Sequence, residues 1–278
     1  MPEFPDWLIA VIAGIVEGVT EFLPISSTGH LIITSDLLQF DNLEGTFEIF
    51  IQIGAVIAVI LFYRAELLQQ TQNVISSDTR LNQNARQLWL GIIIAFFPAA
   101  IMGLLFGDQI DEWLFNPTTV SIALIVGGIM FIIVEYFLKT KDAADEPPSS
   151  IETTPLTYRQ ALLVGCWQVL ALIPGMSRSG MSILGGMLSG LDRQRATQFS
   201  FYLAMPTLGA ATLYTLIKDF DTISSNDFFL LAIGTIVSGI VAWFSIGWLL
   251  RYVATNSFIA FGIYRIVVGI CLLLLLNI

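Results

Sequence analysis

The stretch EGVTEFLPISSTGH, residues 17–30, interrupts an apolar segment with two glutamates, a proline, several hydroxyl side chains and a histidine. A second break, IPGMSRSGMS at residues 173–182, interrupts another apolar segment, and each break has a serine three residues after its proline. Such backbone cannot face lipid, because unpaired amide groups in hydrocarbon cost several kcal/mol each. We therefore predict two re-entrant helical hairpins, over residues 7–35 and 160–190.

The composition indicates a membrane protein. Of 278 residues, 55% are hydrophobic and 12% charged, with a mean hydropathy of +0.78, whereas a soluble domain carries roughly a quarter charged residues. Most of the net charge of −10 comes from acids in short loops, so we expect no nucleic-acid partner. Apolar runs close to bilayer length predict six full spans: residues 47–63, 88–107, 118–139, 199–217, 228–250 and 258–277.

The order hairpin, three spans, polar linker, hairpin, three spans is an internal repeat. Because each half has an odd number of full crossings, the second half should lie upside down relative to the first. The predicted fold class is thus an all-α integral membrane protein with an inverted-topology repeat. We assign residues 1–139 to the first half, 140–157 to a cytoplasmic linker and 158–278 to the second half.

The basic residues predict the orientation of the chain. They alternate to one side, which the positive-inside rule assigns to the cytoplasm: Arg64, Arg80, Arg86, Lys139, Lys141, Arg159, Arg193, Arg195 and Arg251. The opposite side carries almost only acids. Both termini should therefore be extracytoplasmic, with the first hairpin entering from the outer face, the second from the cytoplasm, and their tips meeting near mid-membrane.

Two glutamates stand out in the first break. Glu17 and Glu21 are four residues apart on a helix, so their carboxylates share one face. Burying two like charges is expensive unless a divalent metal, a shared proton or a nearby base compensates them. A polar face that lines a water-filled cleft is the simpler alternative.

His30, the only histidine in the chain, follows the Ser-Ser-Thr-Gly turn of the same break. An imidazole suits proton transfer near neutral pH. Ser27, His30 and Glu21 could therefore supply nucleophile, base and orienting acid in the manner of a catalytic triad. The alternative for His30 is a packing role.

The second break has the features of an anion site. Arg178 lies at the start of the helix that leaves this break, where a guanidinium and free backbone N–H groups favour phosphate. We expect further phosphate contacts from nearby hydroxyls, although small residues also serve close helix packing. These hydroxyls belong to Ser177, Ser179, Ser182, Ser26 and Thr28.

Three other polar residues lie within apolar segments. Arg265, in FGIYR, could pair with Glu135, with a carboxylate in a cavity, or with the substrate, and a structural ion pair is the favoured interpretation. For Gln52 and Gln168 we predict hydrogen-bonded support.

The segments EGVTEFLPISSTGH (17–30) and PGMSRSGMS (174–182) resemble the signature segments of the undecaprenyl-diphosphatase family, the bacitracin-resistance type of lipid pyrophosphatase. Similar stretches elsewhere extend the resemblance over essentially the whole chain: FIQIGAVIAVILFYR (50–64), FPAAIMGLLF (97–106), FSFYLAMPTLGA (199–210) and FGIYR (261–265). The resemblance implies a bacterial inner-membrane enzyme that hydrolyses undecaprenyl diphosphate to the monophosphate and inorganic phosphate, recycling the lipid carrier of peptidoglycan synthesis.

The resemblance also implies which residues act. It assigns functional roles to Glu17, Glu21, Ser27, His30 and Arg178, with Ser177 beside them. Ser182 stands where the family pattern usually has threonine, which keeps the hydroxyl. A divalent cation, Mg or Ca, is expected at the carboxylate pair.

Some alternatives stay open at this point. The nucleophile could be Ser27, His30 or a metal-bound water, and the oligomeric state is undetermined, a homodimer included. The expected partners are a polyprenyl diphosphate substrate and membrane lipid. Because broken helices in inverted repeats are typical of secondary transporters, a transporter or flippase of lipid phosphate or another anion is the alternative function.

Overall fold

The computed structural model describes residues 4–38, 46–142, 156–219 and 225–276, and within these ranges all regular structure is helical. The first half of the chain forms α1 (Asp6–Thr20), α2 (Ser27–Leu38), α3 (Thr46–Phe62), α4 (Arg64–Asn73), α5 (Thr79–Leu114) and α6 (Pro117–Asp142). The second half forms α7 (Tyr158–Val169), a short 3₁₀ helix η1 (Leu170–Leu172), α8 (Arg178–Leu188), α9 (Arg193–Asp219), α10 (Ser225–Val253) and α11 (Ile259–Leu275). The all-helical prediction is confirmed for the described residues.

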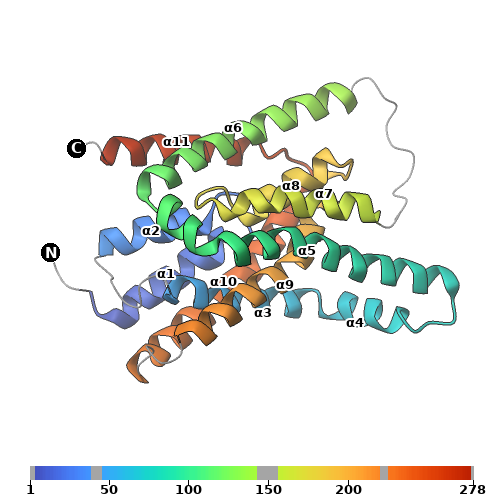
Figure 1. The fold of residues 1–278 in the computed structure, drawn as a ribbon, viewed down its shortest axis with the longest axis horizontal. Helices are drawn as coiled ribbons and strands as arrows, with labels where there is room; N and C mark the ends of the chain where they lie inside the picture. The colour runs from blue at the N-terminus through green and yellow to red at the C-terminus, as the bar shows by residue number, and fades with distance from the viewer. Residues whose placement is uncertain (1–3, 39–45, 143–155, 220–224, 277–278) are drawn as a thin grey trace.

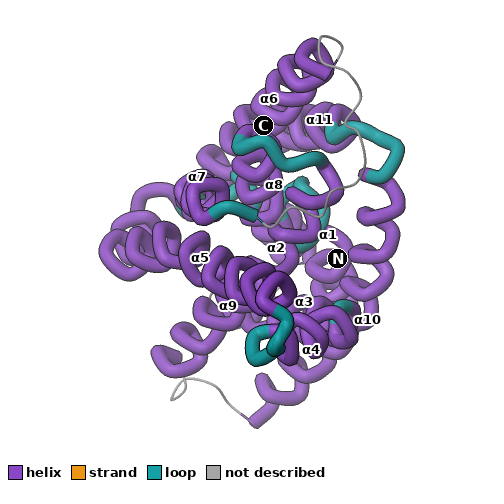
Figure 2. Tube along the Cα trace, turned by 90° about the vertical axis from the view of Figure 1, so that its right-hand side faces the viewer, coloured by secondary structure: helices purple, strands orange, loops and turns teal. Residues whose placement is uncertain are grey.

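Each region predicted to be a hairpin contains two helical pieces separated by a break. The first break separates α1 from α2 at residues 21–26, and the second separates η1 from α8 at residues 173–177. Figure 1 shows both helix pairs between α6 and α11 on one side and α3, α9 and α10 on the other. Seen along the bundle in Figure 2, α1, α2 and α8 lie inside a ring of the longer helices. The breaks therefore lie at the centre of the molecule.

The central helices are held by close packing. Helix α1 packs along α10, α5 along α7, α3 along α9, and α6 along α11. At Gly18 a Cβ atom would lie only 2.6 Å from the carbonyl oxygen of Ser238, so α1 and α10 approach to backbone contact. This approach carries the two glutamates of α1 and its C-terminal turn into the middle of the bundle.

Over the described residues each of the six predicted spans overlaps one helix almost completely, although the spans 47–63 and 258–277 extend past the ends of α3 and α11. The lengths of these helices differ. Four described helices, α5, α6, α9 and α10, are long and apolar enough to cross a membrane. Helix α3 qualifies only together with α4, from which it is bent by 66°, and α11 is a shorter apolar helix. Large apolar side chains cover the outside, for example Leu104 at 74% and Phe244 at 70% exposure. These are the features of a multi-pass membrane protein.

The predicted linker, residues 140–157, lies mostly outside the described residues. Helix α6 continues to Asp142. Helix α7 begins with a capping box, in which the Thr157 hydroxyl accepts from the Gln160 backbone N–H at 3.3 Å and the Thr157 N–H donates to the Gln160 side chain at 2.9 Å. This cap gives the second hairpin a defined start.

Candidate active site

The two breaks share one local design. Ser26 has a φ of 72° and Ser177 a φ of 74°, in the left-handed region that non-glycine residues rarely adopt. Each accepts, through its hydroxyl oxygen, a hydrogen bond from the backbone N–H three residues later, at 3.4 Å and 3.1 Å respectively, and so caps the next helix. When the two breaks are aligned at their capping serines, Ser27 corresponds to Arg178. When they are aligned at their prolines, as the sequence suggested, Ser27 corresponds to Ser177 instead. The first residue of each new helix is thus a functional candidate.

Glu21 joins the two breaks. The Ser27 hydroxyl donates to Glu21 Oε2 at 2.6 Å, and Arg178 Nη2 donates to Glu21 Oε1 at 2.7 Å. All three side chains are largely buried, so these charge-assisted bonds are shielded from water. Because Ser27 is the donor, the lone pairs of its Oγ remain available for attack on an electrophile.

Arg178 is held from a second side by Ser200 of α9. Its Nη1 donates to the Ser200 carbonyl oxygen at 3.0 Å and lies 3.5 Å from the Ser200 hydroxyl. The guanidinium also lies 5.7 Å from the centre of the Phe22 ring. Its Nε is buried and has no hydrogen-bond partner among the described residues. The Nε–H is therefore one of the guanidinium donors that an anion could use.

Ser200 was not predicted from the sequence. It lies in the FSFYLAMPTLGA stretch without a spacing signal, and only its hydroxyl in a largely apolar helix hinted at a role. Its side chain is fully buried, and its Oγ is 2.7 Å from the Ser182 Oγ. Ser182 and Ser200 therefore support Arg178 together.

The other predicted phosphate hydroxyls have protein partners, with one exception. Ser179 Oγ donates to the Leu23 carbonyl oxygen at 3.1 Å and is 3.0 Å from the Ser177 Oγ. Ser182 Oγ donates within its own helix. These hydroxyls connect the two breaks to each other and to α9. Thr28, at the start of α2, is partly exposed, and no described residue bonds to its hydroxyl.

His30 lies beside the nucleophile candidate but does not contact its hydroxyl. Its Nδ1 is 2.7 Å from the Ser26 carbonyl oxygen, and its Nε2 is 2.8 Å from the Tyr264 hydroxyl on α11. The triad arrangement with His30 as the acceptor for Ser27 is therefore not the one observed, because Glu21 takes that position. The carbonyl one helical turn before His30 draws the imidazole away from Ser27.

Glu17 is fully buried, and neither of its carboxylate oxygens has a hydrogen-bond partner among the described residues. The negative charges of Glu21 and Glu48 repel its carboxylate, and the positive charge of Arg178 attracts it. An isolated buried carboxylate is several kcal/mol unfavourable. Glu17 thus suits a proton or a bound cation.

A divalent cation would use Glu17 first. Both oxygens of Glu21 already accept hydrogen bonds, from Ser27 and Arg178. In the described parts of the chain, no three histidine, cysteine or acidic side chains are grouped so as to hold a metal ion. Carboxylate oxygens are nevertheless ligands that Mg²⁺ and Ca²⁺ prefer, and Mg²⁺ commonly takes the rest from water and substrate phosphate. The orphaned oxygens of Glu17 fit that mode of binding.

Arg265 is fully buried and donates only to backbone carbonyls in the described structure. Its Nη1 is 3.1 Å from the Pro24 oxygen in the first break, and its Nη2 is 2.9 Å from the Gly175 oxygen in the second. The Ala123 and Leu124 oxygens of α6, at 3.3 and 3.4 Å, complete the set. Arg265 is therefore a clamp between the breaks, and its interpretation as an ion pair was wrong.

Glu135, the partner considered for Arg265, pairs elsewhere. Arg193 Nη2 donates to its Oε2 at 2.6 Å, and the Phe258 backbone N–H donates to its Oε1 at 2.8 Å. This contact ties the starts of α9 and α11 to α6. Of the two glutamines, Gln168 lies with its Oε1 3.5 Å from the Thr207 hydroxyl, but its buried Nε2 has no partner among the described residues. The predicted hydrogen-bonded support is therefore only partial at Gln168, and for Gln52 it stays a prediction.

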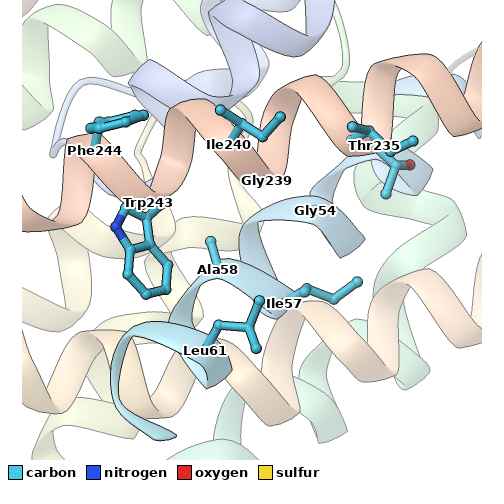
Figure 3. Close-up of a pocket in the computed structure, with 10 residues that line it drawn as sticks. Gly54, Ile57, Ala58, Leu61, Thr235, Gly239, Ile240, Trp243 and Phe244 are labelled. Atoms are coloured by element: carbon cyan, nitrogen blue, oxygen red, sulfur yellow. The ribbon is translucent and has the colours of Figure 1, made fainter.

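An apolar groove runs along the seam between α3 and α10 (Figure 3). Its volume is about 360 Å³, within the range of roughly 300–1,000 Å³ for ligand pockets. The lining residues are Gly54, Ile57, Ala58, Leu61, Thr235, Ile236, Gly239, Ile240, Trp243 and Phe244. On α10, the residues that meet α1 are different ones, such as Val237 against Gly14. The groove therefore faces outward, separated from Glu17 by α10.

Comparison with known proteins places the chain in a family. A family model described as "Bacitracin resistance protein BacA" matches residues 10–271. Undecaprenyl-diphosphatase of Deinococcus radiodurans is 48% identical over 275 residues, which cover 98% of this chain and 96% of the relative. Undecaprenyl-diphosphatase 1 of Chromobacterium violaceum is 48% identical over 267 residues, which cover 95% of this chain and 94% of the relative. Undecaprenyl-diphosphatase of Neisseria meningitidis serogroup C is 45% identical over 276 residues, with 97% and 96% covered. The chain belongs to the bacitracin resistance protein BacA family.

Proposed function

We propose that this protein hydrolyses undecaprenyl diphosphate to undecaprenyl phosphate and inorganic phosphate, and so returns the lipid carrier to peptidoglycan synthesis. Relatives that match nearly the full chain are named for this activity. The observation that carries the proposal is the contact chain Ser27–Glu21–Arg178, with distances of 2.6 and 2.7 Å. It brings a hydroxyl, a carboxylate and a guanidinium together in one buried site, which supports roles as nucleophile, proton acceptor and anion-binding group.

In the first step, Ser27 Oγ attacks the terminal phosphorus. The bond between that phosphorus and the bridging oxygen breaks, polyprenyl monophosphate leaves, and the Ser27 proton passes to Glu21. The donor direction of the 2.6 Å Ser27–Glu21 bond supports this proton path. Phosphoryl transfer depends mainly on positioning and charge neutralisation, which the Arg178 guanidinium and the free N–H groups at the start of α2 and α8 would supply.

In the second step, water attacks the phosphorus of phosphorylated Ser27. The bond between phosphorus and Oγ breaks, Oγ recovers its proton from Glu21, and inorganic phosphate leaves. The water gives up one proton beyond the one that stays on phosphate, and His30, the only imidazole of the chain, is our candidate acceptor. Direct attack by His30 has less support, because both its ring nitrogens are already hydrogen-bonded. A proton can still reach Nε2 through the Tyr264 hydroxyl, whereas a phosphoryl group cannot.

We propose that a divalent cation, Mg or Ca, binds at Glu17 together with Glu21. The unpartnered oxygens of Glu17 support this site. When bound, such a cation neutralises charge on the diphosphate. Besides the free N–H groups at the starts of α2 and α8, the Thr28 hydroxyl and the Arg178 Nε are side-chain donors for phosphate oxygens.

We propose the inverted-repeat architecture as well, with halves at residues 1–139 and 158–278. Its support is the set of helix pairings: α6–α11 and α3–α9 each join one half to the other, and α1–α10 is matched by α7–α5. The start of α1 and the C-terminal end of α11 lie at one end of the bundle, and α4 lies at the other end (Figure 1). With the positive-inside rule, both termini and the opening of the first hairpin would face outward from a bacterial inner membrane.

The rival function, a transporter or flippase of lipid phosphate or another anion, has less support. A binding site alone does not require a serine hydroxyl hydrogen-bonded to a buried carboxylate, as Ser27 is. The relatives named above are diphosphatases.

The test is phosphate release from a polyprenyl diphosphate by the purified chain in detergent, with and without chelator. Wild type should release phosphate, and Ser27→Ala should not. Ser245→Ala is a matched control, since Ser245 is also buried but donates within its own helix at 3.0 Å. Acid quenching with substrate labelled at its terminal (β) phosphate should trap label on Ser27. No release by wild type with cation present would favour the transporter, and release by Ser27→Ala would exclude Ser27 as nucleophile.

A further inference from the structure

His30 and Tyr264 form a contact between two helices that are far apart in the chain. The Tyr264 hydroxyl on α11 is 2.8 Å from His30 Nε2 on α2, and the two rings are inclined by only 4° with centroids 5.7 Å apart. At 2.8 Å the contact is within the distance range of a hydrogen bond, so one of the two groups donates to the other. Tyr264 gave no signal in the sequence beyond its place in FGIYR.

The direction of this hydrogen bond follows from the other side of the imidazole. His30 Nδ1 is 2.7 Å from the Ser26 carbonyl oxygen, which can only accept. The proton of a neutral His30 must then be on Nδ1, and the lone pair is on Nε2. Tyr264 is consequently the donor to Nε2, and a proton that reaches Nε2 in this arrangement passes through the Tyr264 hydroxyl.

The position of Tyr264 is fixed by its neighbour. Arg265 is fully buried and bonds to four backbone carbonyls, two of them in the breaks. Tyr264 itself is 43% exposed, and both its hydroxyl and its ring contact His30. Two adjacent residues of α11 thus contact the functional region: Arg265 holds the two breaks, and Tyr264 holds the His30 imidazole.

We propose that Tyr264 is a positioning residue for His30. Its hydroxyl covers Nε2 and keeps the imidazole oriented so that Nδ1 holds the Ser26 carbonyl. Ser26 directly precedes the nucleophile and has a φ of 72°, so the backbone of Ser27 is stabilised through His30 from α11. The kinetic consequence rests on the proposed diphosphatase function, whereas the hydrogen bond itself does not.

The first experiment reads the hydrogen bond without any activity. Because His30 is the only histidine, ¹⁵N-histidine labelling of the full chain, purified without a histidine tag, gives NMR signals from this imidazole alone. Wild type should show a protonated Nδ1 and an unprotonated, hydrogen-bonded Nε2. In Tyr264→Phe the Nε2 signal should move toward that of a free imidazole nitrogen. An unchanged Nε2 signal, or a proton on Nε2 in wild type, overturns the proposal.

The second experiment uses turnover of a polyprenyl diphosphate. Tyr264→Phe should lower kcat about two- to tenfold, the equivalent of one hydrogen bond, with little change in KM. Combined with His30→Ala it should cause no further loss, because the two residues act as one unit. Tyr214→Phe, at a 56% exposed position of α9, is the matched control and should behave as wild type. Losses that multiply in the double variant overturn the positioning role.

The two experiments separate the failure of this proposal from that of the proposed function. If wild type shows no turnover but the Nε2 signal responds to Tyr264→Phe, the diphosphatase function fails while the positioning contact stands. If turnover is normal in Tyr264→Phe and the Nε2 signal does not move, the contact fails alone.

Discussion

Arg265 donates to the carbonyl oxygen of Gly175 at 2.9 Å, from a helix 90 residues further along the chain. The same guanidinium reaches Pro24 at 3.1 Å in the other break. Carbonyls in a broken helix have no N–H one turn later to satisfy them, and in a buried site water does not replace it. One arginine therefore bonds to a carbonyl of each break and ties the two breaks to each other.

Replacing Arg265 should lower the stability of the fold, and the loss of activity should follow from that. Arg265→Met leaves four buried carbonyl oxygens without this donor, at a cost of roughly 1–3 kcal/mol for each that stays unsatisfied. We expect a large fall in the thermal midpoint in detergent and loss of phosphate release. Arg265→Lys should recover little, because an ammonium cannot reproduce the fork of donors.

The control for this variant is Arg159→Met at an exposed position of α7, which should melt like wild type. If Arg265→Met melts normally yet loses activity, the arginine acts on substrate and the clamp is the wrong description.

Much of the fold could be predicted because membranes restrict the choices. Runs of apolar residues allow only helices, and Pro24 and Pro174 with their neighbouring polar residues mark where helices must break. A meeting of the two breaks was expected, whereas the direct pairing of Glu21 with Arg178, which are 157 residues apart, was not predicted. Bends were not predictable in this way: the 66° angle between α3 and α4 left no proline or glycine signal at Tyr63.

The contacts within the site were less accessible to sequence reasoning. Arg265 bonds to backbone carbonyls, and a carbonyl carries no residue-specific signal. His30 was expected to serve Ser27, but spacing along a helix cannot show that a carbonyl and a tyrosine from α11 compete for its nitrogens. Ser200 was missed for the same reason, since it acts through an arginine on another helix.

Arg178 and Ser200 should differ in how much they contribute to turnover. Arg178→Lys loses the bond to Glu21 or the bond to Ser200, since a single ammonium replaces both Nη groups. We expect kcat/KM to fall about 100-fold or more, as when a preorganised donor is removed. Ser200→Ala keeps the carbonyl acceptor and should cost only about two- to tenfold. Steady-state phosphate release measures both, and equal losses would contradict the supporting role of Ser200.

Glu17→Gln should weaken the dependence on divalent cation. The variant keeps the shape of the side chain but removes a charged oxygen ligand of the kind that Mg²⁺ and Ca²⁺ prefer. The cation concentration for half-maximal phosphate release should rise at least about tenfold. Residues that only support a metal ligand already change metal affinity by about this factor, and Glu17 would be a ligand itself. Glu66→Gln is the control, because Glu66 is bound by Gln198 at 3.0 Å and should leave the titration unchanged. Wild-type activity that is insensitive to chelator would contradict a cation at Glu17.

Gly175 and Gly190 form a matched pair for testing how tightly the second break is packed. Both have a φ of 96°, so an alanine at either position carries a similar backbone strain of roughly 1–2 kcal/mol. Their surroundings differ. A Cβ at Gly175 would lie 2.5 Å from the Val120 carbonyl oxygen, whereas at Gly190 the nearest atom, Gln160 Nε2, is 4.0 Å away.

Gly175→Ala should therefore lower the thermal midpoint well beyond Gly190→Ala. The clash is with backbone, so relief requires the break to move away from α6, and that movement breaks the 2.9 Å bond to Arg265. Because Arg178 begins the helix three residues later, phosphate release should fall in Gly175→Ala and persist in Gly190→Ala. Equal thermal midpoints for the two variants would mean that the second break can move away from α6 without loss of stability. That result would contradict the role of Arg265 as a clamp between the breaks.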